Sequence, residues 1–100
     1  MEELKTILKK TLQDYAGEGL NSYTHLMSNA EDTAFAVIAS ASIRGKPIVN
    51  TGILAQIEGD TIIIERDMND KQVVDALVQN GVPREKIVLA YIGETLVPSN

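Results

Sequence analysis

Apolar residues recur at two different spacings along this chain, and the spacings divide it into helices and strands. Near the N-terminus the apolar residues recur every three or four positions, at Leu4, Ile7, Leu8, Leu12 and Tyr15. Charged and amide side chains fill most of the positions between them, which is typical of an amphipathic helix. The pattern predicts a helix over residues 2–16, and the segment GEG that follows predicts its end.

The middle of the chain changes to a period of two. In residues 33–43 and 49–57 the odd-numbered positions are mostly apolar, and the even-numbered positions are mostly small or polar. This alternation predicts two strands that each bury one face. The segment before them, residues 22–29, predicts only a loop or a short strand.

The apolar faces of these two strands determine the pairing that we expect. If both faces turn toward one core, Ile43 lies opposite Val49 and Phe35 lies opposite Ile57. Residues 45–47 are then expected to form an odd-length loop or a bulge. A two-residue turn is not expected, because it would bring a polar residue opposite Phe35.

A second hairpin follows the first. A two-residue turn at residues 59–60 pairs Ile57 with Ile62 and Ala55 with Ile64, which keeps apolar side chains on one face. The consecutive strands are therefore expected to form an antiparallel meander.

A helix and a last strand complete the predicted fold. Asn69 and Gln72 resemble a capping box at the start of a helix over residues 69–80, and Gly81 predicts its end. Residues 87–91 are apolar at every position, as in a strand that is covered on both faces and parallel to a neighbour. The sequence thus predicts an α+β fold in the order α-β-β-β-β-α-β, with a mostly antiparallel meander sheet and two helices.

Composition places the chain among ordinary globular proteins. Its 100 residues are 44% hydrophobic and 23% charged, and we expect a single domain over residues 1–100. No apolar run reaches the length of about 18 residues that a membrane span needs, so we expect a cytoplasmic protein. The absence of cysteine excludes disulfides and cysteine-bound metal. The net charge of -5 disfavours direct DNA binding, which depends on basic side chains that neutralise phosphates.

Residues that could carry chemistry are few. The one histidine, His25, has no nucleophile partner in a recognisable motif and is not predicted to be a site. Glu65, Asp67 and Asp70 cluster near a strand end and could hold Mg²⁺ in a divalent-metal phosphodiesterase or nuclease. Residues two apart on a strand point to the same side, which would bring the first two carboxylates together. A restriction-type nuclease would place a lysine where Asp67 stands, so we expect no catalytic residue, metal or cofactor and keep the enzyme as the alternative.

The second face of the predicted sheet is flat, rich in small residues and partly apolar. The expected pairing places Ile38 opposite Leu54, with Ile48 and Ile63 on the same side. A helix could cover this face, or its apolar residues could simply be singly exposed, or the face could bind a second copy of the chain or a different protein. Gly52 lies within it and permits either a close backbone approach or a simple bulge. The four apolar residues are the candidate protein interface.

A series of local motifs resembles one known family. A hairpin, IVNTGILAQIEGDTIIIERD, is followed by a helix end, ALVQNGVP, and by a last strand, EKIVLAY. In this order and spacing the motifs resemble the XisI-like family, the fdxN element excision controlling factors of cyanobacteria, over about residues 5–92. The chain has no tryptophan in the sheet and ends on YIGETLVPSN, so it reads as a divergent and C-terminally short relative.

The resemblance implies a small α+β protein that supports programmed DNA excision together with a companion factor, XisH. A separate recombinase would carry out the strand chemistry. We therefore expect a non-enzymatic regulatory protein that binds an XisH-like partner and can also form a homo-oligomer. An antitoxin-like inhibitor of a neighbouring nuclease would make a similar protein contact and is a further alternative.

Overall fold

The computed structural model describes residues 4–19, 22–69 and 71–95, so the first residues of the predicted N-terminal helix and Asp70 lie outside it. The described elements, in chain order, are α1 (Leu4–Gln13), β1 (Gly17–Gly19), β2 (Ser22–Ser28), β3 (Ala34–Ile43), β4 (Lys46–Glu58), β5 (Thr61–Asp67), α2 (Val73–Gln79), the 3-10 helix η1 (Arg84–Lys86), β6 (Ile87–Leu89) and the 3-10 helix η2 (Ala90–Ile92). Within the described residues the six strands form one sheet in chain order, and only β5 and β6 pair in parallel. The predicted α+β fold and its order α-β-β-β-β-α-β are confirmed, with β1 as a short additional strand.

The first helix ends earlier than the sequence predicted. α1 buries Leu8 and Leu12 completely, as its apolar stripe requires. The helix stops at Gln13 and the chain then makes turns, so the GEG segment does not end it. Residues 17–19 instead pair with β2 as an edge strand, and the interpretation of this segment as only a helix stop was wrong. Pairing with β2 decides its conformation, and three residues carry too little alternation to predict a strand.

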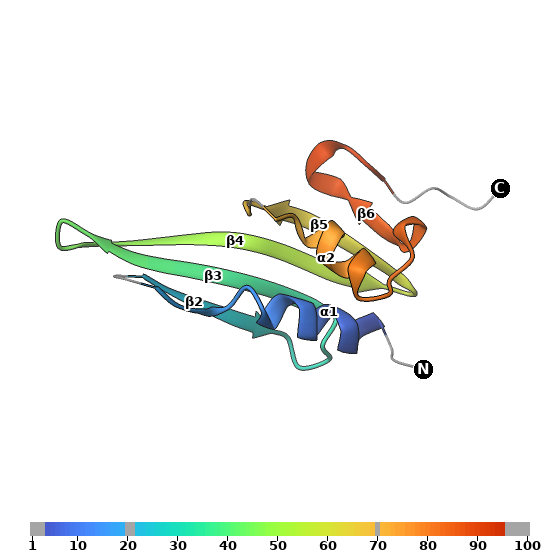
Figure 1. Ribbon diagram of the computed structural model, residues 1–100, viewed down its shortest axis with the longest axis horizontal. Helices are drawn as coiled ribbons and strands as arrows, with labels where there is room; N and C mark the ends of the chain where they lie inside the picture. Colours follow the sequence, from blue (N-terminus) through green and yellow to red (C-terminus); the bar gives the residue numbers. More distant parts are fainter. Residues whose placement is uncertain (1–3, 20–21, 70, 96–100) are drawn as a thin grey trace.

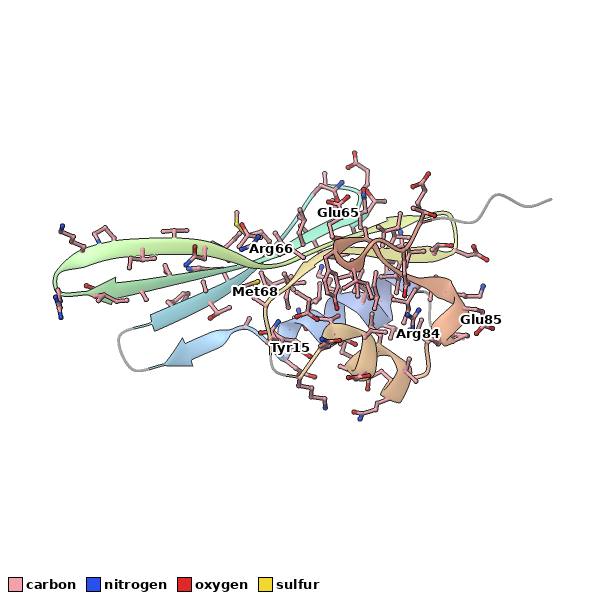
Figure 2. The ribbon with its side chains drawn as sticks, turned by 90° about the horizontal axis from the view of Figure 1, so that it is seen from above. Tyr15, Glu65, Arg66, Met68, Arg84 and Glu85 are labelled. Carbon is pink, nitrogen blue, oxygen red and sulfur yellow. The ribbon has the colours of Figure 1, made fainter. Side chains whose placement is uncertain are left out.

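Both helices pack on the same face of the sheet, as Figures 1 and 2 show. The core between the two layers contains Leu8 and Leu12 of α1, Phe35 and Val37 of β3, Ile53 and Ala55 of β4, Ile62 and Ile64 of β5, Val73 and Leu77 of α2, and Ile87 and Leu89 of β6. Burying one large apolar side chain stabilises a fold by about 1.5–3 kcal/mol. This face of the sheet, here called the helix-side face, therefore anchors the fold, and the opposite face is called the outer face.

The turn between β3 and β4 differs from the prediction. It contains two residues, Arg44 and Gly45, whose φ angles of 53° and 77° are both positive, as a type I′ turn requires. Ile43 therefore pairs with Lys46 and not with Val49. The expected odd-length loop is absent because this turn already matches the twist of the strands that it joins.

The extra residue that the apolar pattern requires lies in the middle of β4. Val37 pairs with Ile53, whereas the next residue, Ile38, pairs with Thr51, so Gly52 is left over as a β-bulge. A Cβ atom added to Gly52 would lie 3.7 Å from the carbonyl oxygen of Val37, which is an ordinary contact. Of the two interpretations of Gly52, the structure therefore supports the bulge.

The bulge changes which face each β4 residue joins. Phe35 pairs with Ala55 and not with Ile57, and this register still keeps odd-numbered residues together in the core. Beyond the bulge, odd residues of β3 meet even residues of β4, and directly paired residues share a face. Ile48 pairs with Ala41 and so lies on the helix-side face. Its predicted place on the outer face was wrong for this reason.

The second hairpin agrees with its predicted register. Ile57 pairs with Ile62 and Ala55 pairs with Ile64 across a turn whose first residue, Gly59, has a φ of 62°. A glycine at this position adopts the positive φ angle without steric cost. The last strand, β6, runs parallel to β5, as its continuous apolar run indicated.

A carboxylate outside the helix caps the start of α2. One oxygen of Asp67, Oδ2, accepts a hydrogen bond from the backbone N–H of Val73 at 2.6 Å. The other oxygen, Oδ1, accepts bonds from the backbone N–H of Asn69 at 3.1 Å and from its side-chain amide at 2.8 Å. The helix thus begins at Val73 and not at residue 69, and Asn69 does not cap it. Its predicted end is confirmed, since Gly81 has a φ of 103° just after the last turn.

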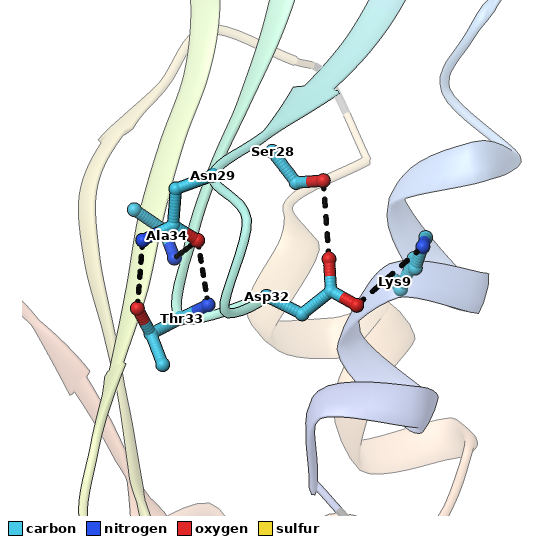
Figure 3. A network of polar contacts seen from close by, with 6 residues as sticks. All are labelled: Lys9, Ser28, Asn29, Asp32, Thr33 and Ala34. Carbon is cyan, nitrogen blue, oxygen red and sulfur yellow. Dashed lines mark hydrogen bonds and ion pairs between the residues drawn. The ribbon is translucent and has the colours of Figure 1, made fainter.

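The turn between β2 and β3 is tied together and to α1 by side chains (Figure 3). The side-chain oxygen of Asn29 accepts hydrogen bonds from the backbone N–H groups of Thr33 and Ala34, at 2.8 and 3.0 Å. Asp32 forms an ion pair with Lys9 of α1 at 3.7 Å. These contacts hold one end of the sheet against the first helix.

The other end of the sheet projects beyond the helices, as Figure 1 shows. Residues 38–51 form the outer half of the β3–β4 hairpin, with the start of β2 beside it, and are here called the arm. The molecule measures 54 × 29 × 26 Å, and its radius of gyration is 14.3 Å. A compact domain of 100 residues would have a radius of gyration of about 13 Å. The arm accounts for the elongated shape.

Candidate protein-binding face

The outer face of the sheet carries apolar side chains that neither α1 nor α2 covers. Cross-strand pairing aligns Met27 of β2, Ala36 of β3, Leu54 of β4 and Arg66 of β5 in one row across this face. Met27 is 59% exposed and Leu54 is 37% exposed. α1 and α2 both lie on the helix-side face, so neither of them covers the outer face.

The structure places three of the four predicted interface residues on this face. Ile38 and Leu54 do not face each other as expected, since Ile38 pairs with Thr51 in the neighbouring row. Ile38 is half-buried, and Ile63 is only 8% exposed, so Ile63 contributes little accessible surface to this face. Ile48 lies on the helix-side face and is not part of this surface.

Two further residues of the surface were missed from the sequence. Tyr23 and Met27 of β2 lie on the outer face beside Ser40 and Ala36, and Tyr23 is 42% exposed. They were missed because residues 22–29 predicted no definite strand. We define the outer patch as Tyr23, Met27, Ile38 and Leu54.

His25 extends the outer patch along β2. Its ring lies 4.1 Å from that of Tyr23, centroid to centroid, and the two planes are tilted by 47°. Its strand partner, Ile38, is apolar. A histidine in these surroundings is part of a mixed aromatic and apolar surface.

Of the three carboxylates that could have held a metal ion, Glu65 and Asp67 lie on opposite faces of the sheet, and Asp70 lies outside the described residues. Glu65 is the extra residue of a second bulge. It accepts a hydrogen bond at 2.7 Å from the side chain of Gln56, and the strand pairing of Gln56 places that residue on the outer face. Asp67 pairs with Ile53, a core residue, and so lies on the helix-side face. The expectation that the two point to the same side was wrong because the bulge inverts the alternation. Residues 4–19, 22–69 and 71–95 contain no group of three metal-binding side chains.

One open hollow of about 570 Å³ lies at the other end of the molecule, beside β6, and is lined by Arg84, Glu85, Glu94 and neighbouring residues. Arg84 and Glu94 form an ion pair at 2.8 Å, and a Glu94 oxygen accepts the backbone N–H of Leu89 at 2.9 Å. The Leu89 N–H and then Arg84 hold the pKa of Glu94 below its usual value. Arg84 and Glu94 are therefore paired with each other, while Glu85, which also lines the hollow, is exposed.

Among the described residues no helix is long and apolar enough to cross a membrane.

Comparison with known families shows that the family described as "XisI protein" matches residues 1–97. Comparison with curated proteins gives no match.

Two solved structures, both from Anabaena variabilis ATCC 29413, are similar to this one. The first is a XisI-like protein, with a TM-score of 0.66, 23% identity, and coverage of 86% of this chain and 78% of that one. The second is the fdxN element excision controlling factor XisI, with a TM-score of 0.66, 17% identity, and coverage of 87% and 88%. At these identities the likeness establishes a shared fold.

Proposed function

The chain belongs to the XisI family, and from this membership we propose that it is a non-enzymatic accessory protein that helps control programmed excision of a DNA element. One of the proteins that share its fold is itself an fdxN element excision controlling factor. In this proposal the chain acts by binding another protein, and it performs no strand chemistry.

The observation that carries the proposal is the outer patch. It joins exposed apolar and aromatic side chains on a sheet face that neither α1 nor α2 covers. Large aromatic residues and methionine are enriched at protein interfaces, and charged residues are depleted from the interface core. On β2, β3 and the part of β4 that pairs with β3, this face carries no Lys, Arg, Asp or Glu. Charged residues lie on the flanking strands, with Glu18 of β1 paired with Tyr23, and Glu65 and Arg66 on β5. A protein surface suits such a patch better than a phosphate backbone does.

The partner that we propose is an XisH-like protein, as the family resemblance implies. A net charge of -5 opposes direct DNA binding. Recruitment through a protein partner would let an acidic chain act on a DNA rearrangement without contacting the DNA. The partner would supply the nucleic-acid contacts.

The test compares two variants of equal charge in a binding assay. Leu54→Asp places a carboxylate in the outer patch, and Val78→Asp places one on α2, where Val78 is similarly exposed at 45%. The tagged proteins are incubated with lysate of the source cells, with and without nuclease, and retained proteins are identified by mass spectrometry. Circular dichroism checks that both variants fold.

Wild type and Val78→Asp should retain an XisH-like protein after nuclease treatment, whereas Leu54→Asp should lose it. Burying an unpaired carboxylate in an interface costs several kcal/mol, so the loss should exceed tenfold. Retention by Leu54→Asp would exclude the outer patch. Retention that disappears with nuclease for all proteins would mean that nucleic acid mediates the contact.

A further inference from the structure

The helix-side face of the arm carries apolar side chains and extends past the helices. Pairing places Ala39, Ala41 and Ile43 of β3 on this face, opposite Asn50, Ile48 and Lys46 of β4. Ile43 is 54% exposed and Ile48 is 40% exposed, and neither has a covering layer within the described chain. A sheet face of this kind is stable when another layer packs on it. This surface is separate from the outer patch, because it lies on the opposite side of the same strands.

Charge is distributed unevenly between the arm and the rest of the molecule. Residues 34–57 contain two charged side chains, Arg44 and Lys46, and both are basic and lie at the tip of the arm. All 14 acidic residues of the chain lie outside this segment. The tip is therefore positive on a molecule that is otherwise acidic.

The base of the arm, on the same face, is acidic. Figure 2 shows Tyr15 at the end of the helical layer that faces the arm. Asp14 directly precedes Tyr15, and Asp67 binds the backbone N–H of Val73, two residues after Lys71, at the start of the helix that contains Asp75. Burial, and then the negative charges of Asp67, Asp75 and Asp14, raise the pKa of Tyr15. The Tyr15 hydroxyl donates a hydrogen bond to the backbone carbonyl of Lys71 at 2.7 Å, which fixes the ring at this position. Asp14 and Asp75 are exposed and accessible to a basic group from outside.

The dimensions of the arm and of the helical layer match each other. From Val37 at the base to Ile43 near the tip, the six residue steps of β3 span roughly 20 Å. The helical layer stands about 10–12 Å deep on the sheet, and a second sheet packs about 10 Å above a first. The arm of a second copy, packed on the helix-side face of the first arm, would therefore lie at about the height of the helical layer and beside it. The tip of that second arm would end at the acidic base of the first copy.

We propose that two copies of this chain form a symmetric dimer in which their arms pack antiparallel through the helix-side faces. The twofold axis brings Arg44 and Lys46 of each copy to the acidic base of the other, and Ile43 and Ile48 of both copies into one apolar layer. The layer that covers this face is a second copy, because each chain carries both the positive tip and, about one arm length away, the negative base that the tip of the other copy would contact. Each copy thus presents the same self-complementary patch, as a twofold interface requires.

Pairing of the arms edge to edge is less suitable than packing of their faces. The outer part of β4, residues 46–51, has no neighbouring strand on its free side within the described chain. Pro47 in this segment has no backbone N–H to donate to a new strand. The carbonyl of Thr51 already accepts a hydrogen bond from Arg66 Nε at 2.6 Å. The edge is therefore partly blocked, whereas the face is open.

The first test is a measurement of molar mass by sedimentation equilibrium on the purified chain, without any partner protein. The wild type should show a concentration-dependent rise from 10.9 kDa to twice that mass. Ile48→Glu should weaken the dimer at least tenfold, because it buries two unpaired carboxylates. Val49→Glu is the matched control, since Val49 is the next residue, is 64% exposed and pairs with Ser40 on the outer face. A wild type that is monomeric at several hundred micromolar, or a dimer that both variants leave intact, overturns the proposal.

The second test exchanges charges between the tip and the base. Lys46→Glu and Asp14→Lys should each weaken self-association at least threefold at low salt. Asp14 follows the last turn of α1, where a cation is favourable, so Asp14→Lys should fold normally. Mixing the two variants should restore dimerisation to the wild-type strength. In the mixed dimer, one tip-to-base contact carries both exchanged charges, which still attract, and the other tip-to-base contact keeps the two original charges. Absence of restoration on mixing overturns the proposed arrangement, and these results do not depend on whether an XisH-like protein binds.

Discussion

Replacement of Asp67 by alanine should destabilise the fold by about 2–3 kcal/mol, although this carboxylate belongs to no catalytic site. Asp67 bridges the end of β5 and the start of α2. Its Oδ2 atom accepts the backbone N–H of Val73 at 2.6 Å, and its Oδ1 atom accepts the backbone N–H and the side-chain amide of Asn69. Val73 is completely buried, so water cannot readily replace the lost acceptor.

The magnitude follows from these contacts. A hydrogen bond to a charged acceptor contributes about 1.5–3 kcal/mol, and loss of a helix N-terminal cap costs about 0.5–2 kcal/mol. The two values overlap, because both include the bond to Val73, so they do not add. Asp67→Asn keeps one carbonyl oxygen as an acceptor and should lose less than the alanine variant. For a domain of this size, each kcal/mol lowers Tm by roughly 4–8 °C.

Urea unfolding followed by circular dichroism measures the free energy of unfolding of each variant. Glu65→Ala is the control, because this nearby carboxylate is exposed and accepts one hydrogen bond, from Gln56. Its removal should change stability by less than about 0.5 kcal/mol. A loss below 1 kcal/mol for Asp67→Ala, or equal losses for the two alanine variants, would refute the assignment of Asp67 as the cap of α2.

Two other predictions concern pH and metal ions. The pKa of Glu94 lies below its usual value of 4.5, because the Leu89 N–H and Arg84 bind the carboxylate. The stabilisation by the Glu94 carboxylate is therefore complete above about pH 4.5 and is lost as the pH falls through the lowered pKa. Thermal melts of wild type and Glu94→Gln should therefore differ at pH 7 and converge toward pH 3, and a constant difference would contradict this. Millimolar Mg²⁺ or Mn²⁺ should leave Tm unchanged, because Glu65 and Asp67 lie on opposite faces of the sheet. A rise in Tm would support the alternative hypothesis of a metal-dependent enzyme.

Local patterns predicted the parts of the fold that depend on short-range contacts. The apolar stripe of α1, the register of the second hairpin and the position of β6 follow from spacing that is visible within a few residues. Gly59 and Gly81 sit where a positive φ angle is needed, and each marks the end of an element. These features are confirmed because the residues that determine them are neighbours in the sequence.

The candidate surface was predicted only in part, and the bulges explain the difference. Alternation extrapolated through Gly52 placed Ile48 on the wrong face, and alternation through Glu65 brought this residue and Asp67 to the same side. A bulge adds one residue to one strand, and the resulting change of face depends on the partner strand. The contribution of β2 was missed because its Tyr23 is recognisable as a surface residue only when β3 lies beside it.

The sequence by itself determined the order of the elements and the apolar side of each long one, because helical and strand periodicities are local properties of the chain. Only the tertiary structure decided which residues share the outer face and which share the arm. That decision depends on where the two bulges shift the pairing, on both helices packing against one side of the sheet, and on the hairpin continuing beyond them. The outer patch and the arm with its basic tip both result from contacts between strands, which periodicity does not encode.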